Sequence, residues 1–233
     1  MDPIIDYRAN TAATAVSRFM TRVFAWMTFG LLITGVVAYV VGNNPEIMRT
    51  MVGSRLSVGT IILLQFVLVF AISFGIRSMS VGVATLCFLL YSFSVGITTS
   101  FIFLAYTAES ISQVFFISAS TFGAMAVFGA VTKRDLSAMG RFLIMVLIGG
   151  IIAMFANFFF HSSGLGALLN IVFVFVFAGL TAYDTQKMRN FAMGGDSESD
   201  TAHKVAILGA LTLYLDFLNL FLSMLNIMGD RRR

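Results

Sequence analysis

The chain has 233 residues, of which 58% are hydrophobic and only 11% charged, and its formal net charge is +4. Soluble domains carry about a quarter of their residues as charged side chains, so this composition excludes an ordinary soluble domain. The apolar residues fall into successive runs of about 20, and at about 1.5 Å per residue each run can cross roughly 30 Å of hydrocarbon. The sequence therefore predicts an all-α polytopic membrane protein in a lipid bilayer, with no nucleic-acid partner.

Seven apolar runs follow a polar amino-terminal segment, residues 1–22, which we expect to be cytoplasmic. Gly42-Asn43-Asn44-Pro45 closes the first run, as expected of a helix-ending sequence. Connections are short except residues 185–204, so the runs should form one transmembrane domain, residues 23–228, followed by a basic tail, residues 229–233. The predicted spans are 23–41, 58–76, 81–106, 114–131, 142–160, 165–183 and 205–228.

The distribution of Lys and Arg orients these spans, because cytoplasmic loops carry an excess of both. With seven spans, ten of the 15 Lys and Arg residues lie on the amino-terminal side. This predicts a cytoplasmic amino terminus and an external carboxyl terminus. A re-entrant hairpin in place of the last span would place thirteen of the 15 on the cytoplasmic side. The last run is long enough to span and has no Pro at which to turn back, which favours seven spans.

The last predicted span carries a polar stripe. At about 100° per residue, spacings of 4, 3, 4 and 3 keep its members on one helix face. An ionisable group inside a membrane is costly and needs a functional or pairing reason. This face should contact protein or water, which favours a place for the helix at the centre of the bundle. The members of the stripe are Thr212, Asp216, Asn219, Ser223 and Asn226.

A second carboxylate, Asp184, closes the sixth predicted span in GLTAYDTQKMRN and alone would be an ordinary interfacial residue. The sixth and seventh spans are antiparallel and joined on its side, so Asp184 and Asp216 could meet. Two carboxylates at close range in a low dielectric cannot easily both ionise, so the pair would titrate as a unit and form a proton switch. Arg77 ends the second span on the same face, where it could bind the ionised pair or be an ordinary positive-inside anchor.

Two segments, LYLDFLNLFLSMLNIMG in the last span and AYDTQK at the end of the sixth, resemble hallmarks of the Bax-inhibitor family in its bacterial branch. The resemblance covers nearly the whole chain, including the basic turn KRDLSAMGRF after the fourth span. It implies six helices around a central seventh and a pH-sensitive calcium leak in the bacterial cytoplasmic membrane. It also implies that Asp184 and Asp216 form the pH sensor, and that Arg77 latches to them when the pore is closed.

Calcium as the transported ion is compatible with the polar stripe, and we expect no cofactor. A hard cation takes several oxygen ligands, and Asp216 could be a transient one. There is no EF-hand loop, and weak coordination suits a leak, which must release its ion. We expect the pore lining to include Thr212, Asn219, Ser223 and Asn226. Hydroxyls of the third span could add lining or could bond to their own backbone: Ser92, Ser94, Thr98, Thr99 and Ser100.

An intramembrane aspartyl protease would also pair two aspartates on adjacent spans, one of them in a Tyr-Asp motif such as Tyr183-Asp184. Its second motif is missing, because Leu213-Tyr214-Leu215 precedes Asp216 where Gly-x-Gly would be expected. The Pro-Ala-Leu element of such proteases is also absent. We therefore expect no enzymatic activity.

Two non-catalytic alternatives remain open. The family resemblance also supports a membrane-embedded regulator that binds other membrane proteins, in cell-death control or in restraint of a membrane protease. The polar loop 194–200 could serve such binding, and so could three pairs of small residues spaced for close helix approach: Ala119 with Gly123, Gly149 with Ala153, and Ala178 with Ala182. Such small residues more often pack helices within the same bundle, and such a loop is more often a solvated linker. A proton-coupled cation exchanger would differ from a leak because its flux would depend on a proton gradient.

Overall fold

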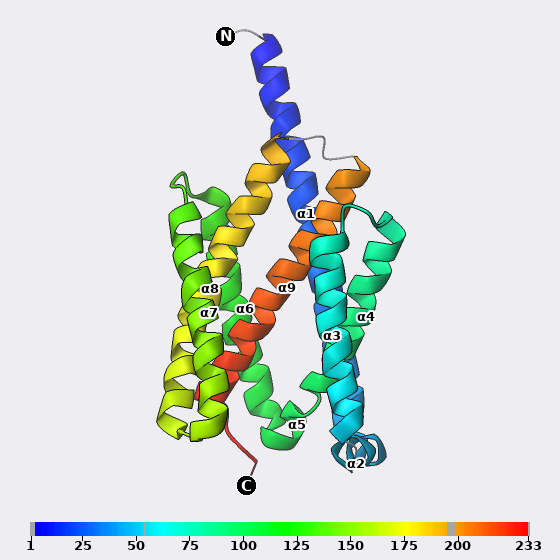
Figure 1. Cartoon of the computed structure of the whole chain (residues 1–233). Helices are drawn as coiled ribbons and strands as arrows, with labels where there is room; N and C mark the ends of the chain where they lie inside the picture. The colour runs from blue at the N-terminus through cyan, green and yellow to red at the C-terminus, as the bar shows by residue number, and fades with distance from the viewer. Residues whose placement is uncertain (1–2, 54, 195–198, 233) are drawn as a thin grey trace. The chain divides into compact units, whose positions relative to one another are not determined.

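The computed structural model describes residues 3–53, 55–194 and 199–232, and over these residues it is helical with no β-strand (Figure 1). Seven stretches are long and apolar enough to cross a membrane, the third of them formed by α4 and α5 together. The prediction of an all-α protein with seven spans is confirmed. The helices are α1 (Pro3–Gly42), α2 (Pro45–Gly53), α3 (Arg55–Gly75), α4 (Val81–Thr99), α5 (Ile102–Ala105), α6 (Ala108–Val131), α7 (Ser137–Phe160), α8 (Ser163–Gly194) and α9 (Asp200–Met228).

The largest correction to the predicted elements concerns the sixth span. Helix α8 continues to Gly194 instead of ending at residue 183, and α9 begins at Asp200 instead of residue 205. The extra turns persist because they bury Met188 and Ala192. The long connection predicted at 185–204 is therefore wrong. The loop 194–200, a predicted contact site, lies mostly outside the described residues.

The first and third spans also differ from their predicted bounds. The amino-terminal segment 1–22 is not separate from the first span, because α1 is helical from Pro3 and Phe19 is fully buried. The third span breaks between Thr99 and Ile102. Hydroxyls just before the break bond to carbonyls of the preceding turn, which competes with regular helix continuation.

Helix α9 is one unbroken helix of 29 residues, so the re-entrant alternative for the last span is not what the chain forms. It is also the most enclosed span: 67% of its apolar window is buried, against 39% or less for the other six. Its first part belongs to one compact unit, which comprises residues up to Ala105 and Met188–Tyr214. Its second part belongs to the other unit, which comprises Tyr106–Lys187 and the residues from Leu215 onward.

In the first unit, α4 packs against both α1 and α3, and α2 contacts α1 and α3. A buried polar connection joins three helices at its centre. The Tyr214 hydroxyl lies 2.6 Å from Oγ1 of Thr34, which in turn donates to the Ser92 carbonyl at 2.8 Å. Since the single Thr34 proton is used by Ser92, Tyr214 is the donor in the first bond. This connection fixes α9 against α1 and α4 within the unit.

Tyr214→Phe is expected to lower the free energy of unfolding by about 1 kcal/mol, because it keeps the ring packing and removes one buried hydrogen bond inside a membrane protein. Thermal unfolding in detergent measures the change. Tyr39→Phe is the matched control, since Tyr39 is 62% exposed. Equal losses in both variants would show that the bond to Thr34 contributes nothing.

In the second unit, α6, α7 and α8 lie side by side (Figure 1), and glycines allow the close approach. A Cβ added at Gly129 of α6 would overlap the Ala182 carbonyl oxygen of α8, and one at Gly140 of α7 would meet the Tyr183 ring. Phe217 of α9 packs against Phe115 and Phe122 of α6, with ring centroids 5.5 and 5.6 Å apart. The second part of α9 is thus held in the core of this unit.

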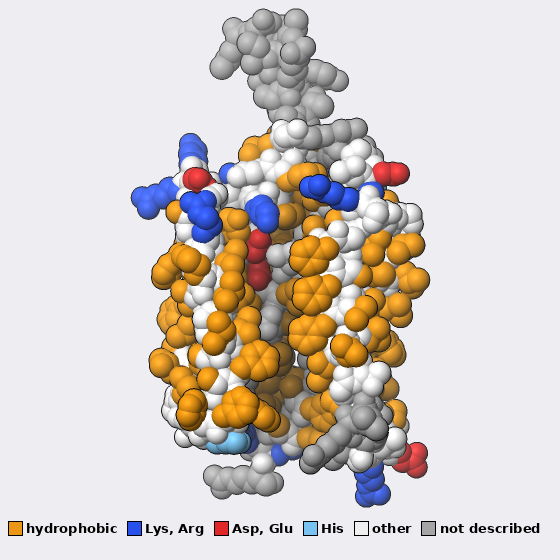
Figure 2. Space-filling model, viewed as in Figure 1, with side chains coloured by type: hydrophobic (Ala, Val, Ile, Leu, Met, Phe, Trp, Pro, Cys, Tyr) orange, Lys and Arg blue, Asp and Glu red, His pale blue; other side chains and the backbone are white. Residues whose placement is uncertain are grey.

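The basic tail is anchored at the start of α6 in the same unit. The Thr107 N–H donates to the Asp230 carbonyl at 3.1 Å, and the Asp230 N–H donates to the Ser110 hydroxyl at 2.9 Å. Figure 2 shows, for each unit by itself, hydrophobic side chains over the flanks and Lys and Arg side chains gathered toward the ends. This pattern is typical of membrane-spanning helices.

Candidate functional site

Asp184 of α8 and Asp216 of α9 lie together in the second unit. Both are buried, at 8% and 4% exposure, and their carboxyl groups lie close enough to interact with each other. The pairing predicted from the order of the two spans is therefore present in the structure. Asp184 is not at a helix end as predicted, however, because α8 continues beyond it to Gly194.

Two carboxyl groups this close can form a hydrogen bond only when one of them carries a proton, because an ionised carboxylate only accepts. Oδ2 of Asp216 is buried and has no hydrogen-bond partner within the described residues. The neighbouring Thr185 is fully buried, and its Oγ1 likewise has no partner there. Buried polar atoms without partners are rare in native structures and require an explanation. The pair can therefore bind and release a proton within a site that offers little other stabilisation.

The immediate neighbours of the pair on α8 are polar and charged. Lys187 lies close enough to act on Asp184 electrostatically, and its Nζ also lies 5.9 Å from the centroid of the Tyr183 ring. Gln186 is 4% exposed and bonds to the loop between α6 and α7. The exposed end of this segment thus carries positive charge, while its inner part holds the acid pair.

The other residues of the polar stripe use their polar groups mainly within α9. Thr212 donates to the Leu208 carbonyl at 3.0 Å. Asn219 and Asn226 each donate from Nδ2 to the carbonyl four residues earlier, at 2.8 Å. Oδ1 of Asn226 also accepts from the Tyr106 hydroxyl at 3.1 Å. Ser223 is 5% exposed. The stripe is therefore packed against protein over much of its length.

Arg77, the predicted latch, lies in the turn between α3 and α4, with an exposed side chain. Its carbonyl accepts a hydrogen bond from Nζ of Lys204 at 3.2 Å. Arg77 belongs to the first unit and the acid pair to the second. Its action as a latch stays a prediction.

The hydroxyl groups of the third span bond to their own backbone, which was one of the two alternatives predicted for them. Each of the five donates to a carbonyl three or four residues earlier in its own helical stretch. Within the described residues, no group of three His, Cys, Asp or Glu side chains could hold a metal ion. The prediction that Asp216 binds calcium is therefore supported by its own carboxylate and by the neutral amide and hydroxyl oxygens of α9.

Two buried polar residues near the pair were missed in the sequence. Gln186 stands two residues after Asp184, and Tyr214 stands two residues before Asp216. Each reaches partners far away in the chain, 50 and 180 residues distant respectively. The sequence feature that could have identified both residues is their position two residues from a carboxylate in an apolar segment.

Comparisons with known proteins agree over nearly the full length. A family model described as "Inhibitor of apoptosis-promoting Bax1" matches residues 16–233. "Inner membrane protein YbhL" from Escherichia coli strain K12 is 44% identical over 232 residues, which cover 99% of this chain and 97% of that protein. An uncharacterized protein from Borreliella burgdorferi is 44% identical over 216 residues, 93% of each chain. A protein of Rickettsia prowazekii is 38% identical over 241 residues, covering 98% of this chain and all of its own.

Proposed function

This chain belongs to the Bax-inhibitor family of membrane proteins, and on that premise we propose that it is a pH-sensitive calcium leak of the bacterial cytoplasmic membrane. The observation that carries the proposal is the close approach of the two buried carboxyl groups of Asp184 and Asp216. Such a pair changes its net charge when it exchanges one proton. In a low-dielectric site this change is large enough to bias a conformational equilibrium.

The position of the pair along the chain gives the charge change a means of action. The division between the two compact units falls between Lys187 and Met188 in α8, and between Tyr214 and Leu215 in α9. Asp184 and Asp216 thus stand within a few residues of the points at which α8 and α9 pass from one unit to the other. A change in the distance or orientation of the two carboxyl groups therefore acts on α8 and on α9 near these two points.

The proposed gate closes when the pair is ionised and opens when it is protonated. Two neighbouring negative charges need a counter-charge, which Arg77 supplies as the latch in the closed state. Protonation removes one charge and releases Arg77, so calcium flux rises as pH falls. If one proton controls the gate, the flux changes by at most about tenfold per pH unit.

The proposed ion path follows the polar stripe of α9. The Nδ2 atom of Asn219 is used by the Leu215 carbonyl, which leaves Oδ1 as the atom that can face a passing cation. Asp216, together with hydroxyl and amide oxygens, offers weak and transient coordination. Weak coordination suits conduction, because the ion must leave as readily as it enters. The amino terminus is proposed to be cytoplasmic, from the excess of Lys and Arg on that side.

Calcium flux into proteoliposomes that contain a calcium dye tests the proposal. The flux is expected to rise when both sides are moved together from about pH 8 to about pH 6, and to need no proton gradient. Variants His161→Gln and His203→Gln serve as controls, because histidine is the side chain that ordinarily changes charge in this range. A flux that requires a proton gradient would favour an exchanger instead. The absence of calcium flux at every pH would contradict the proposal.

A membrane-embedded regulator is the second candidate, and one observation favours it. Cβ atoms built on Gly123 of α6 and Gly149 of α7 meet nothing within 4 Å. Within the described residues nothing packs against these two positions, so they are open to a helix of another membrane protein. Under the leak proposal, Gly123→Leu leaves calcium flux unchanged. A regulator would instead lose its cellular effect in this variant while its fold and flux persist.

A further inference from the structure

We propose that Gln186 is the positioning residue of the acid pair, because it fastens the α6–α7 loop to α8 and so fixes Asp184 in contact with Asp216. This inference deepens the proposed function, and its consequence for calcium flux rests on that function. The predicted effect of Gln186 on the protonation of the two carboxyl groups does not depend on the proposed function.

The side-chain amide of Gln186 is used at both ends. Oε1 accepts from the Leu136 N–H at 2.9 Å, and Nε2 donates to the Arg134 carbonyl at 2.7 Å. Only one orientation of the amide satisfies both bonds, so the contact has a defined geometry. The residue is 4% exposed, and the loss of either bond would leave a buried polar group without its partner.

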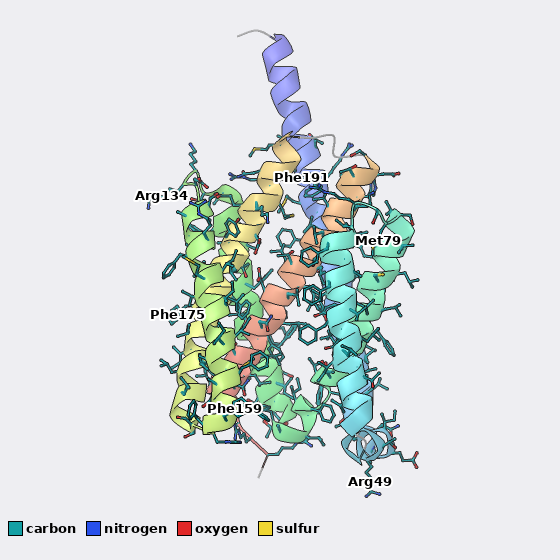
Figure 3. All side chains as sticks on the ribbon, in the orientation of Figure 1. Arg49, Met79, Arg134, Phe159, Phe175 and Phe191 are labelled. Carbon is teal, nitrogen blue, oxygen red and sulfur yellow. The ribbon has the colours of Figure 1, made fainter. Side chains whose placement is uncertain are left out.

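The loop that Gln186 holds is itself preformed. The Arg134 N–H donates to Oγ1 of Thr132 at 3.3 Å, and the Ser137 N–H donates to Oδ1 of Asp135 at 2.9 Å. Leu136 is buried beneath the loop. Arg134, labelled in Figure 3, extends its side chain away from the helices into the exposed region while its carbonyl faces Gln186. The loop therefore offers α8 a fixed backbone rather than a flexible connection.

The loop also keeps its charge state over the pH range of the proposed gate. Hydrogen bonds from the side chain and backbone of Ser137 lower the pKa of Asp135 below its ordinary value of 3.8, and Arg141 contributes further. Because the pKa is lowered, any stabilisation from this carboxylate is lost only as pH falls through a value below 3.8. The contact between Gln186 and the α6–α7 loop, which we call the clamp, thus keeps the same charge between about pH 8 and pH 6. The proton exchanged in this range belongs to the acid pair.

Segment 182–186 of α8 is held from several sides at once. The backbone of α6 touches it at Gly129, and α7 touches it at Gly140. At about 100° per residue, Gln186 and Asp184 project from nearly opposite sides of the helix. The loop therefore holds α8 from one side while Asp216 meets it from the other. If the clamp is removed, α8 is free to rotate or shift, which changes the contact between the carboxyl groups.

The test replaces Gln186 by Met, which keeps the length of the side chain and removes both hydrogen bonds. Gln113→Met is the matched control, because Gln113 is an exposed glutamine of α6 in the same unit. The readout is the infrared band of protonated carboxyl groups in the full-length protein, assigned to the pair by its absence in Asp216→Asn. In Gln186→Met the frequency of this band is expected to change and its pH midpoint to shift by about 1 unit. Gln113→Met should match wild type.

Gln186→Glu covers the case in which the Met variant fails to fold. It keeps an acceptor for the Leu136 N–H and loses the donor to Arg134, so it should also change the band. If both variants keep the wild-type band and midpoint while their melting temperatures fall, Gln186 is purely structural and the inference is overturned. If the band responds to Gln186→Met but wild type carries no calcium, the positioning role stands and the leak function fails. If flux titrates with pH while the band ignores Gln186, the function stands and the positioning role fails.

Discussion

Asp216→Asn is expected to abolish the pH response of calcium flux and to hold the flux at the level that wild type reaches at about pH 6. Asn has nearly the shape of a protonated aspartic acid, and it cannot ionise. The asparagine amide can donate a hydrogen bond to Asp184, so the side chain permanently represents the protonated form. Wild type should differ by about tenfold or more between the two ends of the pH range, and the variant should not differ. Flux in proteoliposomes at several pH values measures the effect.

The control for this prediction is Asp200→Asn, the same substitution at an exposed carboxylate in the first turn of α9. It should keep the wild-type pH profile. Asp184→Asn should behave like Asp216→Asn, and the double variant should add nothing further, because the two carboxyl groups exchange one proton as a unit. A folded Asp216→Asn variant with an unchanged pH profile would show that the pair is not the sensor.

Gly129→Ala is expected to have the largest effect on stability, about 2–3 kcal/mol of unfolding free energy. The added Cβ would overlap the carbonyl oxygen of Ala182. This neighbour is a backbone atom and cannot rotate away, so α6 and α8 must separate. Thermal or denaturant unfolding in detergent checks the loss. The separation occurs two residues from Asp184, so the pH profile of flux should shift as well.

Gly123→Ala is the matched control, on the same helix with open space around the added atom. It should be neutral or slightly stabilising, because Ala favours helix over Gly by about 1 kcal/mol. If Gly129→Ala and Gly123→Ala have the same stability, α6 and α8 do not approach as closely at Ala182 as the structure shows.

The number and order of the spans were predictable because hydrophobic runs are a local property of the sequence. Asp216 was identifiable for the same reason, since a carboxylate within an apolar helix is conspicuous. The end of α8 was not predictable in this way. Lys187 and Arg189 end the apolar run, but a helix can continue beyond the apolar run that it contains. Buried Met188 and Ala192 keep α8 folded to Gly194.

The surroundings of the acid pair depend on contacts that spacing cannot reveal. Gln186 is polar and close to charged residues, so it resembles an ordinary interfacial residue until its partners in the distant α6–α7 loop are known. Tyr214 resembles a membrane aromatic residue until its bond to Thr34 is seen. The amides of Asn219 and Asn226 satisfy carbonyls of their own helix, so helical spacing alone overstates how much of the stripe is free to line a pore.

The most direct measurement records calcium flux and the infrared band of the protonated carboxyl pair on the same wild-type proteoliposomes, as pH is stepped from about 8 to about 6. We expect both signals to titrate together with the same midpoint, and both to lose their pH dependence in Asp216→Asn. Flux that titrates at a different pH from the band, or no calcium flux while the band titrates, would contradict a gate controlled by the proton shared between Asp184 and Asp216.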